Sequence, residues 1–291
     1  MRCNQAMMLA DWAQAVPDGT FAIFAESNST TTTNSYTYAG GTTAVATVLS
    51  SIMVLSGAAA GTSSIGIFAA GQTGAQNTTF KYTYAGGATV AGTTLSAIAV
   101  NQGSAAGNST VGVFNGGGGF SQTCAYTYSG ATVAAGTYLQ AAATAPAATG
   151  NSTVGIFSDS ASSTTAYTYS GATVAAGIAL TGTLREGAAA GNTTAGIFAL
   201  GQGTTATNKY TYSGASVVAG TALSGGMGSS TSQAGSAAGN STLGVFALGG
   251  GVGNATSIYT YSGATVAAGT TLPSGVRSGA GASNGTAGVN M

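Results

Sequence analysis

The strongest constraint on the fold of this chain is a repeat of 41 to 49 residues that runs through most of its 291 residues. Each unit holds a Tyr-Thr-Tyr triplet and, upstream of it, an apolar segment that ends in Phe. The triplets begin at Tyr36, Tyr82, Tyr126, Tyr167, Tyr210 and Tyr259, and the Phe positions are Phe24, Phe68, Phe114, Phe157, Phe198 and Phe246. Self-similarity at this period is typical of architectures whose units pack against their neighbours.

Each unit reads as four short strands. In one of them, residues 187–191 are small, residues 195–199 are apolar, residues 209–213 carry the triplet, and residues 216–223 form the fourth segment. Asn beside Gly tolerates the left-handed backbone of tight turns, so residues 192–194 are predicted to turn the chain between the first two strands.

The triplet itself indicates a strand. Side chains two residues apart share one face of a strand, so Tyr210 and Tyr212 should point the same way and Thr211 the other. Helix is excluded because Gly recurs densely and apolar residues show no helical spacing. The triplets use twelve of the 13 tyrosines, and we interpret these side chains as packing residues rather than binding residues.

Four strands in a unit of this length is the blade of a β-propeller. The predicted fold is therefore all-β, with residues 1–291 forming a single propeller domain of six to seven four-stranded blades. The small first strands should line the axis, while Phe and Tyr should pack between adjacent blades.

The number of blades depends on the two ends of the chain. Six complete repeats occupy about residues 10–276, and a terminal half-repeat follows at 277–291, with a turn at 283–286 and a strand at 287–289. In the favoured arrangement of seven blades, residues 1–9 supply a closing strand to this half-repeat. The alternative is six blades with an ordered tail.

Charge excludes several partners. The chain has five Lys and Arg, five Asp and Glu, and no His, and charged residues are 3% of the total. Scattered cations cannot make the basic face that nucleic acid requires, and no charged run would hold a membrane surface. The apolar stretch 42–61 fits two strands and a loop in the repeat register, so we reject a transmembrane helix there.

Cysteine usage gives no metal or disulfide framework. Cys3 and Cys124 form no Cys-x-x-Cys pair, and the absence of His leaves no zinc site. We expect both thiols to be unpaired and the protein to need no metal or cofactor.

The repeat resembles kelch-type repeats, in which an apolar strand ending in two glycines precedes a Tyr-containing strand. Residues 114–117 (Phe-Asn-Gly-Gly) followed by the triplet at Tyr126 fit that pattern. The chain departs from it where kelch repeats carry Trp, because Leu stands there in five units. Those residues are Leu95, Leu139, Leu180, Leu223 and Leu272.

A closer likeness is to the Gly-, Thr- and Ala-rich kelch-like repeats of bacteriophage tail-fibre and other virion appendage proteins. The runs 150–157 (Gly-Asn-Ser-Thr-Val-Gly-Ile-Phe) and 167–177 (Tyr-Thr-Tyr-Ser-Gly-Ala-Thr-Val-Ala-Ala-Gly) carry this likeness. It implies a structural or adhesive role on a virion.

The chain lacks most of the side chains that usually carry out catalysis. Without His, only Asp11, Asp18, Glu26, Asp159 and Glu186 could act as general bases. Three of them fall in the first unit, but Asp18-Gly19 occupies a turn position. The glycine-rich run 115–119 has no Lys-Ser/Thr after it and so is no phosphate loop. We expect no enzyme activity and no catalytic residues.

Eight Asn-x-Ser/Thr sequons occur, and five coincide with the repeated turn, so turn geometry accounts for them without sugar. The sequon asparagines are Asn28, Asn77, Asn108, Asn151, Asn192, Asn240, Asn254 and Asn284.

Recognition is expected from loops, because loops carry binding residues on a scaffold of strands. The variable loops are residues 27–35, 71–79, 115–123, 158–165, 200–208 and 248–257. We expect a virion structural protein that contacts copies of itself or other virion proteins, with host surface glycan as a further partner. The alternative is an extracellular microbial surface or filament protein that binds carbohydrate.

Overall fold

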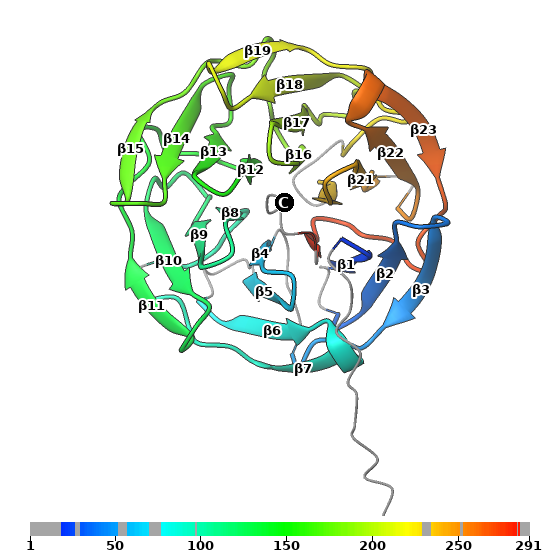
Figure 1. The fold of residues 1–291 in the computed structure, drawn as a ribbon, viewed down its shortest axis with the longest axis horizontal. Coiled ribbons are helices and arrows are strands. Elements are labelled where there is room, and N and C mark those ends of the chain that lie inside the picture. The colour runs from blue at the N-terminus through cyan, green and yellow to red at the C-terminus, as the bar shows by residue number, and fades with distance from the viewer. Residues whose placement is uncertain are drawn as a thin grey trace, which may run out of the picture.

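The repeat units build a ring of six four-stranded antiparallel sheets (Figure 1). The computed structural model describes residues 19–26, 30–51, 57–69, 77–96, 98–228, 234–250, 253–283 and 285. The all-β propeller predicted from the sequence is confirmed, with six blades from the expected six to seven.

The innermost strand of each blade is the run of small residues. These strands contact one another in a closed circle around the axis, and each is buried. They are, in blade order 1 to 6, β24 (Ala280–Ser283), β4 (Ala58–Gly61), β8 (Ser104–Gly107), β12 (Ala148–Gly150), β16 (Ala188–Gly191) and β20 (Ser236–Gly239).

The second and third strands hold most of the buried aromatic residues. The second strands are β1 (Phe21–Ala25), β5 (Ile65–Ala69), β9 (Val111–Asn115), β13 (Val154–Ser158), β17 (Ala195–Ala199) and β21 (Leu243–Ala247). The third strands are β2 (Thr33–Thr37), β6 (Thr79–Thr83), β10 (Thr123–Thr127), β14 (Thr164–Thr168), β18 (Thr207–Thr211) and β22 (Thr256–Thr260).

The outer strands form the rim and are largely exposed. They are β3 (Thr42–Ala46), β7 (Ala88–Ala91), β11 (Thr132–Ala135), β15 (Thr173–Ala176), β19 (Ser216–Ala219) and β23 (Thr265–Gly269). Two short 3-10 turns, η1 (Ala85–Gly87) and η3 (Ser262–Ala264), lead into β7 and β23.

The third strand begins two residues earlier than the sequence predicted. In blade 5 it starts at Thr207, which pairs with Ala199, and Tyr212 lies just beyond its end. The Thr207 hydroxyl donates to the Thr221 carbonyl at 2.8 Å, and all six third strands begin with a Thr that makes the same bond. This hydroxyl fixes the start of the strand.

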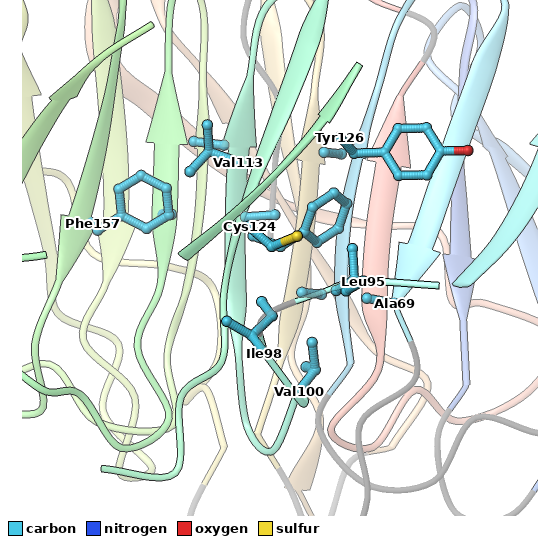
Figure 2. Close-up of a cluster of buried hydrophobic side chains, with 14 of the residues drawn as sticks. Ala69, Leu95, Ile98, Val100, Val113, Cys124, Tyr126 and Phe157 are labelled. Carbon is cyan, nitrogen blue, oxygen red and sulfur yellow. The ribbon is translucent and has the colours of Figure 1, made fainter. Parts of the chain in front are cut away.

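The core lies between blades, as expected. The six repeated Phe side chains are at most 1% exposed, and the first tyrosines of the triplets are at most 4% exposed. Figure 2 shows one such cluster, in which Tyr126 and Val113 of blade 3 lie with Leu95 of blade 2 and Phe157 of blade 4. Burial of one aromatic ring removes about 150–250 Å² from water, which stabilises the fold by roughly 4–6 kcal/mol.

The ring closes through the C-terminal half-repeat. Strand β24 pairs with β1, with Ile23 opposite Ala282, so the end of the chain completes the blade that its beginning starts. The favoured seventh blade is therefore not formed by this half-repeat, because its first strand is used in blade 1. Its predicted closing strand, residues 1–9, and predicted second strand, residues 287–289, lie outside the described residues.

The stretch 42–61 holds β3 and β4, as predicted for two strands. Across the described parts of the chain, no helix has the length and apolarity needed to cross a membrane.

Removal of residues 277–291 should open the ring, because β1 then loses its inner neighbour and blade 1 its innermost strand. We expect a lower and broader thermal unfolding transition by circular dichroism. Addition of a synthetic 277–291 peptide should restore the sharp transition, whereas a peptide of scrambled order should not. An unchanged transition in the truncated chain would contradict closure by β24.

Candidate functional site

The variable loops that the sequence proposed for recognition join the second and third strands, and they share one face of the ring with the connections between blades. Four isolated bridges join the loops to these connections: Asn101 with Gly117, Phe120 with Ala143, Arg185 with Gly201, and Thr204 with Met227. We call this side, made of the loops and the inter-blade connections, the loop face. Loops 115–123, 158–165 and 200–208 are fully described, and the other three in part.

Charge is concentrated on the loop face. Of the seven charged residues in the described ranges, five lie in its loops and connections, and the two lysines lie in third strands. The five are Glu26, Asp159, Arg185, Glu186 and Arg277.

The candidate carboxylates are not brought together. Glu26, Asp159 and Glu186 belong to blades 1, 4 and 5, and Asp11 and Asp18 lie outside the described residues. Within the described ranges, no group of three or more His, Cys, Asp and Glu could hold a metal ion.

Glu26 takes part in a hydrogen-bond network that holds two segments of the chain together. Burial raises the pKa of its carboxyl group, while a hydrogen bond donated by the Asn34 amide at 3.3 Å opposes that rise. Asn34 also accepts a hydrogen bond from the Ser274 hydroxyl at 3.0 Å. The pair therefore anchors the connection that enters blade 1.

A small pocket lies where the inner strands begin on the loop face. All six blades line it, and its polar side chains include Gln102, Glu186 and Ser278. Gln102, Glu186 and Ser278 all have positive φ, between 49° and 59°, which bends the chain into the inner strands. The pocket volume is about 30 Å³, room for about two water molecules. It is too small for a sugar or a nucleotide.

The opposite face, which we call the turn face, holds the repeated asparagines. The Asn151 side-chain oxygen accepts hydrogen bonds from the backbone N–H groups of Thr153 and Val154, at 2.8 and 3.0 Å. Its amide donates to the Thr193 carbonyl of the next blade at 3.3 Å. Asn108, Asn192 and Asn240 repeat this arrangement. These four sequon asparagines therefore serve turns and inter-blade contacts.

The expectation of unpaired thiols can be compared with the structure for one of the two cysteines. Cys124 is a buried free thiol in β10, as expected. Cys3 lies outside the described residues.

The second tyrosine of each triplet reaches the inner strands. A Cβ atom at Gly107 of β8 would lie 3.0 Å from the Tyr128 hydroxyl, and one at Gly150 of β12 would lie 2.6 Å from the Tyr169 hydroxyl. Glycine is needed at these positions because the tyrosine occupies the space of a side chain. Six such tyrosines surround the axis: Tyr38, Tyr84, Tyr128, Tyr169, Tyr212 and Tyr261.

Only two of these six hydroxyls have a hydrogen-bond partner. Tyr38 donates to Ser283 at 2.9 Å, and Tyr212 pairs with Thr149 at 3.2 Å. Both partners replace the usual residue of the inner strand, since Ser283 stands where the other blades have Gly and Thr149 where they have Ala. The hydroxyls of Tyr84, Tyr128, Tyr169 and Tyr261 are buried without a partner.

Sequence reasoning did not find this pattern, although a signal was present. Two of the four Ser and Thr residues in the inner strands partner a tyrosine hydroxyl: Ser283 pairs with Tyr38 of its own blade, and Thr149 with Tyr212 of the next blade. An unsatisfied hydroxyl costs about 1–3 kcal/mol, less than the roughly 4–6 kcal/mol gained by burying the ring. The tyrosines are therefore retained for packing, which supports their interpretation as core residues.

Comparison with known proteins assigns no relatives, because no protein-family model and no curated protein matches the chain.

Replacement of Tyr212 by Phe should lower the free energy of unfolding by about 1 kcal/mol, because Thr149 then loses its partner. Tyr128→Phe is the matched control, since it removes a hydroxyl that has no partner, and it should leave stability unchanged or raise it. Urea denaturation followed by fluorescence measures both. A larger loss in Tyr128→Phe than in Tyr212→Phe would contradict the assignment.

Alkaline pH should unfold the protein. Burial raises the pKa of the second tyrosines, so the folded state keeps them neutral while the unfolded state ionises near pH 10. The contribution of these tyrosines to stability should therefore be constant below about pH 9 and fall as the pH rises above about 10. Tyrosinate absorbance at alkaline pH should appear together with loss of the circular dichroism signal. Titration of all tyrosines in a protein that stays folded would refute this.

Proposed function

We propose that the protein is a non-enzymatic structural protein of a bacteriophage virion, part of a tail, fibre or capsid appendage. The observation that carries the proposal is a ring locked at every interface between blades. Side-chain hydrogen bonds cross all six interfaces, for example from Thr89 to the Val48 carbonyl and from Thr43 to the Thr271 carbonyl, both at 2.8 Å. Such a ring is suited to carrying loops in fixed positions.

The rim supports assembly with other protein surfaces. Its outer strands carry no charged residue, and Val45, Val90 and Val218 on them are 65%, 53% and 55% exposed. Little charge repulsion opposes contact between such surfaces, and exposed apolar residues favour it. We propose that the partners are copies of this chain or other virion proteins.

The loop face supports the attachment part of the proposal. Most charged residues of the described ranges lie there, in the connections between blades and beside or within loops whose sequences vary between blades. Variable loops on a constant scaffold are a common arrangement for recognition. We propose that this face meets the host surface or the neighbouring virion component, with no catalytic step.

Immunogold electron microscopy tests the assignment. Antiserum against the purified protein is applied to particles and cells from a culture of the source. We expect gold at one fixed place on phage particles. Label on cell surfaces or filaments would instead favour the extracellular carbohydrate-binding alternative, and label confined to the cytosol would contradict both.

A further inference from the structure

A groove of about 260 Å³ lies between blades 5 and 6, on the turn face. Blade 5 lines it with Ala195 and Ile197 of β17 and with Lys209 of β18. Blade 6 lines it with Tyr261 and with hydroxyl-bearing residues of its turns. Blade 5, with β17 and β18, and blade 6, with β21 and β22, are neighbours in the upper right of the ring in Figure 1. The volume is close to the lower limit of about 300 Å³ for small-ligand pockets.

One repeat position that lines this groove holds an unusually small residue. Ala195 is the first residue of its second strand, and every other blade has a larger side chain there. Those residues are Phe21, Ile65, Val111, Val154 and Leu243. A second groove, of about 410 Å³, lies at the corresponding place between blades 1 and 2. There Phe21 and Ser35 stand in the positions of Ala195 and Lys209, so the groove of blade 5 is distinguished by its residues.

Lysine at a second repeat position gives the groove a positive charge. Lys209 is half-buried, and its ammonium group has no hydrogen-bond or ion-pair partner in the part of the chain that the structure describes. The same position holds Lys81 in blade 2, but there the residue in the place of Ala195 is the larger Ile65. Only blade 5 combines the lysine with the small neighbour.

The rest of the lining is neutral and of two kinds. The partly exposed ring of Tyr261 provides apolar surface, whereas Ile197, at 1% exposed, provides almost none. Ser241 and Ser262 are exposed at the edge and provide hydroxyl groups. An ammonium group without a partner favours an anionic ligand, while hydroxyls beside apolar surface suit a ligand with alternating polar and apolar faces.

We propose that this groove binds an acidic saccharide, a sugar that carries a carboxylate. The carboxylate pairs with Lys209, the sugar hydroxyls exchange hydrogen bonds with Ser241 and Ser262, and the apolar face of the sugar ring lies on the ring of Tyr261. The groove lies on the turn face, so this ligand is separate from the contact that we propose for the loop face, and the inference rests on the proposed function only for its biological meaning.

Saturation-transfer difference NMR on the purified full chain tests the site, with glucuronate as the probe. Glucose tests the need for the carboxylate, and acetate tests the need for the sugar. We expect saturable transfer to the ring protons of glucuronate, with binding at least about tenfold weaker for glucose and for acetate, and weaker for glucuronate at high salt.

Two substitutions that other blades already contain should remove the binding without unfolding the ring. Lys209→Ala copies Ala125 and Ala166, and Ala195→Ile copies Ile65. We expect Lys209→Ala to weaken glucuronate binding roughly tenfold and Ala195→Ile to abolish it. The matched controls Lys81→Ala and Val154→Ile should bind as the unmodified chain does.

Several results would overturn the proposal. One is absence of transfer from the unmodified protein, and another is equal binding in Lys209→Ala and Ala195→Ile. Acetate that competes as well as glucuronate would show an anion site with no sugar recognition. None of these results changes where immunogold finds the protein, so failure of the groove and failure of the virion proposal are distinguishable.

Discussion

The structure depends on the packing of each blade against the next. A four-stranded sheet of about twenty residues has two faces that it cannot bury alone, so the aromatic rings of one blade are covered by its neighbour. The tyrosines need close approach to the inner strands, and this restricts those strands to Gly, Ala, Ser and Thr. The requirement holds at every interface, so the last blade must meet the first, and β24 makes that contact.

Because the chain has so few charged residues, hydroxyl and amide groups position its strands and turns. The first Thr of each third strand binds a carbonyl fourteen residues later, and Asn151 and its equivalents hold the turns and reach the next blade. These groups are neutral, so their bonds are insensitive to pH near neutrality. The four unpartnered tyrosine hydroxyls show which interaction is stronger, because their burial persists although each leaves a polar atom unsatisfied.

The possible sites differ in how far the sequence could reveal them. The loops were visible as variable segments between constant strands. Lys209 and Ala195 carried no recognisable motif, because they come from adjacent strands of one blade and matter only beside the turns of the next. The pocket on the axis has the same origin, since its lining combines one or two residues from each of six units.

The sequence alone determined the all-β class, the four-strand unit, the inner position of the small residues and the core role of Tyr and Phe, because each follows from periodicity and side-chain size within one unit. The tertiary structure decided the blade number, since pairing of β24 with β1 depends on where two distant ends meet. It also decided which lysine lines an open groove and which tyrosine hydroxyl finds a partner. Contacts between units are set by the geometry of the closed ring, which no single repeat contains.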